Sequence, residues 1–177
     1  MSRLFSREEL RLALAALVDL LVEAKVSSEI YVVGGAAFLL RGIDRRMTVD
    51  IDAKVTNATA VLAIAERLAM QNNWPSDWFN NSARIFVPFD TKYDLWQLYL
   101  EKEGVRVYLA PLDDLLIMKL NAARENRDDE DLAFLFERLG LRTLAEIEIL
   151  YESRSPGEVL PEKAIRLVRN ILSTLHD

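Results

Sequence analysis

Two aspartates, Asp50 and Asp52, are the residues of this sequence with the clearest capacity for chemistry. They alternate with apolar residues in Val49-Asp50-Ile51-Asp52-Ala53-Lys54-Val55, a pattern that predicts a strand with one apolar and one polar face. The two carboxylates would then project from the same face, about 7 Å apart along the backbone. Carboxylates this close repel each other and accommodate a hard divalent cation between them, so the pair predicts a Mg²⁺ site.

A glycine pair precedes these aspartates at the end of a predicted buried strand. The run Ile30–Val33 is rich in β-branched residues, Gly34-Gly35 ends it, and a short helix is expected over residues 36–40. A glycine turn at a strand end offers backbone N–H groups to an anion and lets a phosphate approach closely. Three residues before the aspartates could hold further phosphate oxygens: Arg45, Arg46 and Thr48.

Each of these features also has an ordinary structural explanation. A Gly-Gly pair after a strand is usually a turn, alternating aspartates are common on a solvated sheet face, and a loop arginine pair is usually exposed charge. Here the glycine turn, helix, basic loop and Asp-x-Asp strand occur in this order in one short stretch of chain. This combination favours a functional site over coincidence.

The composition excludes several other chemistries. The 177 residues include no Cys and a single His, His176, which excludes disulfides and Cys-based zinc sites and argues against a His-centred triad. The 28 acidic and 22 basic residues give a net charge of −6, which argues against a broad nucleic-acid-binding surface but permits a local basic pocket. With no membrane span or targeting segment visible, we expect a cytoplasmic protein.

The order of the remaining patterns predicts an α+β fold. A first helix is expected to begin at a Ser6/Glu9 capping box and to run to about Lys25. Further strands are expected at 84–89, 95–100 and 105–109, and later helices after Pro111, over 129–139, after Thr143 and over 162–175. We therefore expect a mixed sheet flanked by helices over residues 1–110, and a helical C-terminal segment over 111–177 that packs on this core as a single compact unit.

The segment 72–82 is expected to be a loop rich in aromatic residues: Trp74, Trp78 and Phe79. These rings could form a stacking platform for a base. Aromatic residues in a loop after a helix more often cover a core, and we favour that interpretation.

The stretch from Val33 to Asp52 resembles the nucleotidyltransferase superfamily typified by DNA polymerase β. Small bacterial and archaeal members, including the toxin partners of abortive-infection-type toxin–antitoxin pairs, share Val-Gly-Gly-Ala-x-x-x-Leu and then Arg-x-Thr-x-Asp-Ile-Asp. The matching positions here are Val33-Gly34-Gly35-Ala36, Leu40 and Arg46-Met47-Thr48-Val49-Asp50-Ile51-Asp52. The resemblance implies a nucleotidyltransferase-like fold, Mg²⁺ bound by Asp50 and Asp52, and a nucleoside triphosphate bound by the Gly34-Gly35 turn and Arg46.

A second block agrees with the same group of proteins. Its form is Pro-x-x-x-Leu-x-x-x-Lys-Leu-x-Ala-x-Arg followed by Arg-Asp-x-x-Asp-Leu, matched by Pro111, Leu115, Lys119-Leu120, Ala122, Arg124 and Arg127-Asp128-Asp129-Glu130-Asp131-Leu132. The resemblance implies that Lys119 contacts phosphate and that Asp131 or Asp128 holds it. One lysine on an amphipathic helix is also ordinary, and acidic residues suit the start of a helix.

The sequence departs from the superfamily in one respect. A third carboxylate normally comes from a later strand and acts as the base, but the predicted strand 105–109 has none. Three nearby acids are not placed by periodicity: Asp94, Glu101 and Glu103.

Three hypotheses follow from these patterns. The first is a Mg²⁺-dependent enzyme that transfers a nucleoside monophosphate from an NTP to an RNA or protein hydroxyl, with membership of a toxin–antitoxin pair as one option. The second is a module on the same fold that binds a nucleotide or a partner protein but turns over poorly. The third is a structural protein whose Asp-x-Asp is only a surface feature.

Overall fold

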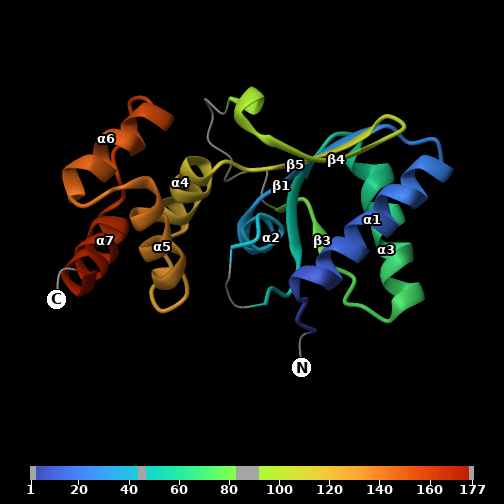
Figure 1. Cartoon of the computed structure of the whole chain (residues 1–177), viewed down its shortest axis with the longest axis horizontal. Helices are drawn as coiled ribbons and strands as arrows, with labels where there is room; N and C mark the ends of the chain where they lie inside the picture. Colours follow the sequence, from blue (N-terminus) through green and yellow to red (C-terminus); the bar gives the residue numbers. More distant parts are fainter. Residues whose placement is uncertain (1–2, 44–46, 83–91, 176–177) are drawn as a thin grey trace. The chain divides into compact units, whose positions relative to one another are not determined.

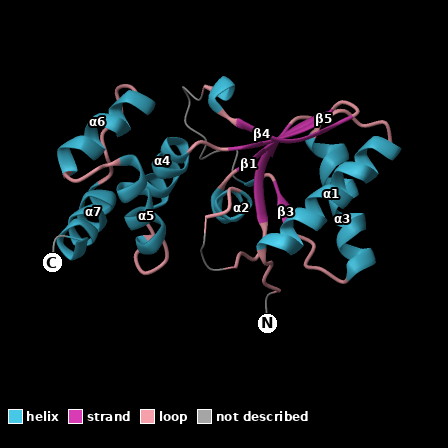
Figure 2. Ribbon diagram, in the orientation of Figure 1, coloured by secondary structure: helices cyan, strands magenta, loops and turns pink. Residues whose placement is uncertain are grey.

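The structure is a computed structural model that describes residues 3–43, 47–82 and 92–175. In that part of the chain it is an α+β protein, as predicted, with one five-stranded sheet and helices before, between and after its strands (Figures 1 and 2). The helices are α1 (Arg7–Glu23), α2 (Gly34–Leu40), α3 (Ala58–Asn72), α4 (Leu112–Ala122), α5 (Asp129–Leu139), α6 (Leu144–Arg154) and α7 (Glu162–Leu175). The strands are β1 (Ser28–Val32), β2 (Ile51–Val55), β3 (Phe79–Asn80), β4 (Gln97–Lys102) and β5 (Val105–Leu109).

The sheet is mixed and has the strand order β3-β2-β1-β5-β4. The central strand β1 pairs antiparallel with β2 and parallel with β5. Strand β2 pairs parallel with β3, and β5 pairs antiparallel with β4. This order places the strand that carries Asp52 between β1 and β3, so its side chain has a neighbouring strand on each side.

The two faces of the sheet differ in burial because side chains alternate along each strand. One face is formed by fully buried residues such as Ile30, Val32 and Ala53, and α1 contacts β4 and β5. The other face carries half-buried and exposed residues, and we call it the polar face: Glu29, Tyr31, Asp52, Lys54, Asn80, Arg106 and Tyr108.

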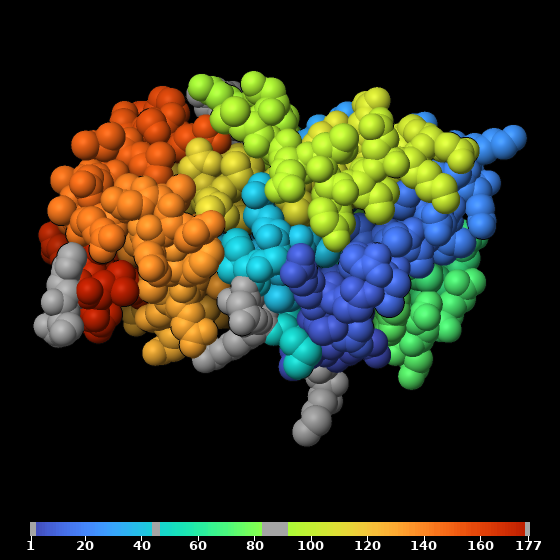
Figure 3. Space-filling view, viewed as in Figure 1, coloured from blue at the N-terminus to red at the C-terminus, as the bar shows by residue number. Residues whose placement is uncertain are grey.

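The chain divides into two compact units: of the described residues, 3–43, 47–82 and 95–110 belong to the first, and 92–94 and 111–175 belong to the second. The first contains the sheet with α1, α2 and α3, and the second contains α4 to α7. On the surface of the first unit, α1 and β4 lie side by side (Figure 3), joined by an ion pair of 2.7 Å between Lys102 Nζ and Asp19 Oδ1. Within the described ranges, every helix is too short or too polar to cross a membrane.

Several boundaries agree closely with the sequence-based predictions. Ser6 and Glu9 form both hydrogen bonds of the predicted capping box at the start of α1, and Thr143 and Glu146 do so at α6. Gly140 ends α5 with a positive φ of 69°. These agreements show that side-chain caps and glycine determine the helix ends here.

Other boundaries differ from the predictions. The strand predicted over 49–55 begins only at Ile51, because Thr48 forms an isolated antiparallel bridge with Phe5 and the chain bends at Val49. The helix predicted over 36–40 begins earlier, at Gly34. The predicted loop 72–82 contains the two-residue strand β3, which is too short to show a periodic pattern.

Two aromatic residues of the segment 72–82 pack in the core, which is the interpretation favoured from the sequence over a stacking platform. Trp78 and Phe79 are buried, and the indole Nε1 of Trp78 donates to the carbonyl oxygen of Ala65 at 2.9 Å. These two rings therefore belong to the core. The predicted strand 84–89 and three residues of interest lie outside the described residues: Arg45, Arg46 and His176.

Candidate functional site

The carboxylate of Asp52 is the centre of the candidate site. Asp52 is half-buried on the polar face of β2, and its backbone carbonyl accepts a hydrogen bond of 2.9 Å from the Val33 N–H. Its side chain has no hydrogen bond or ion pair with any residue that the structure describes. A half-buried carboxylate in this state is available to bind a ligand.

Gly34 lies directly beside this carboxylate. Gly34 has a φ of +61°, and a Cβ atom built on it would lie 3.1 Å from Asp52 Oδ2. A side chain at position 34 would therefore adopt a strained backbone and crowd the carboxylate. The structure thus brings Gly34 and Asp52 together, as expected from the sequence, and glycine keeps space next to the oxygen.

Asn80 occupies the position next to Asp52 on the other side. Strand β3 pairs in parallel with β2 so that Asn80 is in register with Asp52, and the side-chain Oδ1 of Asn80 accepts a hydrogen bond of 2.9 Å from the Ser82 N–H. Sequence reasoning missed Asn80, because β3 is too short to be recognised. Its neighbour Asp52 therefore faces an amide and not another acid.

No third acid joins the aspartates in the described part of the chain. Among the described residues, no group of three or more His, Cys, Asp or Glu side chains is placed to hold a metal ion. Strand β5 carries Arg106 and Tyr108 on the polar face and no acid, and the lack of an acid in this strand was expected from the sequence. Any cation bound at Asp52 would therefore need ligands that are not all carboxylates.

The segment before β2 contains the remaining predicted residues of this half of the site. Asp50 is half-buried and directly precedes β2, and the hydroxyl of Thr48 donates to its carbonyl oxygen at 3.3 Å. The expected roles of Arg45 and Arg46 in phosphate binding stay predictions, because both lie outside the described residues.

Aromatic side chains that the sequence did not single out lie on the polar face. The rings of Tyr31 and Tyr108 stack with centroids 5.1 Å apart, and Trp96 packs edge-on against Tyr31 at 5.3 Å. Tyr31 is paired with Lys54, which places it diagonally across from Asp52, about 7–8 Å away between Cα atoms. The pairing of β1 with β5 brings Tyr31 and Tyr108 together, so no local sequence pattern predicts this cluster.

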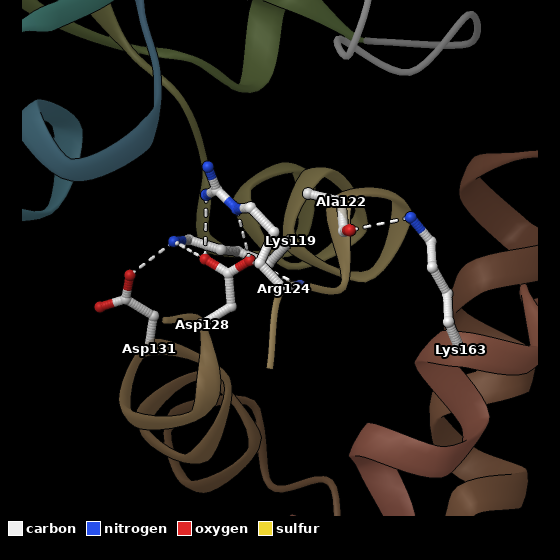
Figure 4. Close-up of polar contacts among 6 residues, drawn as sticks. All are labelled: Lys119, Ala122, Arg124, Asp128, Asp131 and Lys163. Atoms are coloured by element: carbon white, nitrogen blue, oxygen red, sulfur yellow. Dashed lines mark hydrogen bonds and ion pairs between the residues drawn. The ribbon is translucent and has the colours of Figure 1, made fainter. Parts of the chain in front are cut away.

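The second unit holds a buried ion cluster around Lys119 (Figure 4). The ammonium Nζ of Lys119 lies 2.6 Å from Asp128 Oδ1 and 2.6 Å from Asp131 Oδ2. Lys119 is 8% exposed, Asp128 is fully buried and Asp131 is 6% exposed. The resemblance implied that one of the two acids holds Lys119, and in the structure both do so.

Asp128 is further stabilised by Arg124. The backbone N–H of Arg124 donates to Asp128 at 3.1 Å, and its guanidinium donates twice at 3.0 Å. Burial alone would raise the pKa of Asp128, but the hydrogen bonds from Arg124 and Lys119 outweigh it and hold the pKa below its ordinary value. Asp128 therefore remains ionised at neutral pH, and its ion pair with Lys119 fixes the start of α5 to α4.

A second buried ion cluster in this unit was not predicted. Arg154 at the end of α6 hydrogen-bonds to the fully buried Asp114. The Nε atom of Arg154 also lies 3.6 Å from Asp113 Oδ2. Both acids belong to the first turn of α4. Because the partners are 40 residues apart, only the tertiary fold reveals this contact.

A comparison with protein families agrees with the resemblance seen in the sequence. Residues 10–160 match the model of the family described as nucleotidyltransferase of unknown function (DUF6036), and the chain belongs to this family. No curated protein matches the chain, and no solved structure matches it either. The matched range includes Asp50, Asp52 and Lys119, so the family relationship covers both halves of the predicted site.

Proposed function

We propose that this member of the nucleotidyltransferase family transfers a nucleoside monophosphate from an NTP to a hydroxyl group of RNA or protein, in a Mg²⁺-dependent reaction. The observation that supports it most is the half-buried carboxylate of Asp52, which lies beside Gly34 and has no partner among the described residues. Burial of an anion without compensation is unfavourable for folding, so such a group is typical of a binding site.

The donor atoms near Asp52 suit a hard cation. Carboxylate and amide oxygens are the ligands that Mg²⁺ prefers, and the absent side chain of Gly34 leaves room beside Asp52 Oδ2. Asp50 and Asp52 would hold the cation, which when bound would neutralise negative charge on the phosphates. The resemblance and the donor set agree on this assignment.

The chain's own residues would bind and orient the triphosphate. We propose that the Gly34-Gly35 segment lets a phosphate approach the backbone, and that the arginines before β2 hold its oxygens. The resemblance further implies that Lys119 contacts a phosphate. Since Asp128 and Asp131 fix its ammonium, little side-chain entropy would be lost when it binds.

The proposed reaction is a substitution at the α-phosphorus of the NTP. The acceptor hydroxyl oxygen forms a bond to that phosphorus, the bond from the phosphorus to the bridging oxygen breaks, and pyrophosphate leaves. The proton of the hydroxyl passes to solvent or to a base. The contribution of the protein is mainly to position the groups and to stabilise charge.

A second candidate function is supported by one observation. The residue in register with Asp52 on β3 is Asn80, whose neutral amide cannot act as a base. A protein with an asparagine and not an acid at this position could bind nucleotide and turn over slowly, as a regulatory or partner-binding module. The two functions differ in whether a nucleotide is transferred.

A binding assay followed by a transfer assay distinguishes them. Isothermal titration with NTP and Mg²⁺ measures binding, and incubation with α-³²P-labelled NTPs and total RNA or protein measures transfer. The enzyme hypothesis predicts label transfer that is abolished by Asp50→Ala and Asp52→Ala and retained by Asp77→Ala, a change at an exposed aspartate of the same unit. Binding without label transfer would favour the module, and failure to bind NTP or Mg²⁺ would refute both.

The resemblance also suggests an antitoxin partner. A toxin that modifies RNA or protein is expected to arrest growth when it is expressed alone. Arrest by the wild-type chain and not by Asp52→Asn would support this role. Equal growth with both chains would argue against it.

A further inference from the structure

The position of Asn80 suggests a role in the candidate site beyond the residues that the sequence indicated. Asn80 is half-buried on the polar face, and its register partner on β2 is Asp52. Residues that pair across neighbouring strands point to the same face, and the strands lie about 4.8 Å apart. The amide of Asn80 and the carboxylate of Asp52 therefore project side by side from the sheet.

The amide oxygen of Asn80 is also engaged in one hydrogen bond. Its Oδ1 accepts the Ser82 N–H at 2.9 Å, which uses one of the two lone pairs of that oxygen. The second lone pair stays available for a ligand. An oxygen fixed in this way loses little freedom when it binds a cation, which favours binding.

We infer that Asn80 supplies a third ligand of the cation site, an amide oxygen that acts alongside the carboxylates of Asp50 and Asp52. The inference rests on the proposed function. It also accounts for the lack of a third acid at this place in the described residues, because amide oxygens are accepted ligands of Mg²⁺ and Ca²⁺.

The neutral amide has a consequence for the strength of the site. Two carboxylates and one amide carry one negative charge fewer than three carboxylates, so the empty site experiences less repulsion and binds the cation less tightly. An aspartate at position 80 would place a charged carboxylate at the ligand position of the amide, at most about 4 Å from the cation. Even at the dielectric constant of water, a charge at this distance from a divalent cation changes affinity by roughly tenfold or more.

The experiment measures Mn²⁺ affinity by electron paramagnetic resonance on the full chain without nucleotide. The variants are Asn80→Ala, Asn80→Asp and the matched control Asn81→Asp. Asn81 Oδ1 accepts the Val55 N–H at 3.3 Å, an interaction that an aspartate can also make. Val55 is three residues from Asp52 along β2, about 10 Å away. Thermal unfolding of each variant checks that it is folded.

We expect Asn80→Ala to bind Mn²⁺ about tenfold more weakly, Asn80→Asp to bind it at least about tenfold more tightly, and Asn81→Asp to differ by less than about threefold. If Asn80→Ala does not fold, the Mn²⁺ affinity of Asn80→Asp still tests the inference. The new carboxylate can accept the Ser82 N–H, so this variant keeps the local hydrogen bond. Wild-type affinity in the Asn80→Asp variant, or equal tightening by Asn81→Asp, overturns the inference and leaves the proposed function intact. A wild-type chain that does not bind Mn²⁺ overturns both.

Discussion

Replacement of Gly34 by alanine tests the assignment of the site at a residue that carries no functional group. Gly34 has a φ of +61°, where an alanine costs about 1–2 kcal/mol relative to glycine. The new methyl carbon would also lie 3.1 Å from Asp52 Oδ2, so the carboxylate must move by a few tenths of an ångström. Metal–ligand distances tolerate only about 0.2 Å, and we expect Mn²⁺ affinity to fall about tenfold.

Gly140→Ala is the matched control for this prediction. Gly140 has a φ of +69°, but a Cβ atom there would have no atom within 4 Å. It therefore reports the cost of the backbone conformation alone, about 1–2 kcal/mol, without a contact to the site.

Mn²⁺ titration monitored by electron paramagnetic resonance gives the affinity, and urea unfolding gives the stability. We expect both variants to lose stability and only Gly34→Ala to lose affinity. Wild-type Mn²⁺ affinity in Gly34→Ala would refute the idea that this glycine keeps space for a ligand of Asp52.

The other predictions concern charge. Lys119→Met removes the ammonium that lies between the buried carboxylates of Asp128 and Asp131, and it should lower the free energy of unfolding by about 3–5 kcal/mol, measured by urea unfolding. The control Lys163→Met changes an exposed lysine that loses a hydrogen bond to Ala122 and should cost less than about 1 kcal/mol; equal losses would contradict this expectation. Because the pKa of Asp128 is lowered by folding, its stabilising contribution should be complete above about pH 4 and be lost as the pH falls through the folded-state pKa. Between about pH 5 and 3, wild type should therefore lose more stability than Asp128→Asn in thermal unfolding, and parallel curves would argue against a low pKa. Asp52→Asn should abolish Mn²⁺ binding without lowering the free energy of unfolding by more than about 0.5 kcal/mol, because Asp52 has no partner among the described residues and its charge is uncompensated. A large destabilisation would indicate a structural role instead.

Features governed by local chemistry could be predicted from the sequence. The capping boxes at Ser6 and Thr143 identify the starts of two helices, because each side chain satisfies nearby backbone groups. The strand Val105–Leu109 follows from its alternation of buried and exposed residues. The juxtaposition of Gly34 with Asp52 was expected because a short motif links the two residues.

Features that depend on pairing between distant segments could not be predicted. Asn80 lies beside Asp52 only because β3 pairs with β2, and a two-residue strand has no pattern of its own. Two other contacts join residues about 40 positions apart. One is the bridge between Phe5 and Thr48, after which β2 begins only at Ile51, and the other is the ion pair between Arg154 and Asp114. Local propensity contains no information about such contacts.

We propose that the chain transfers nucleoside monophosphates with a cation held at Asp50 and Asp52. The most direct measurement compares label transfer from α-³²P-NTP and from γ-³²P-NTP to RNA and protein, for wild type and Asp52→Asn, with Mg²⁺ and with chelator. The account predicts label in the acceptor from the α-position only, with release of pyrophosphate, in wild type with Mg²⁺ and in no other sample. Transfer of the γ-label, or α-label transfer that persists in Asp52→Asn, would contradict it.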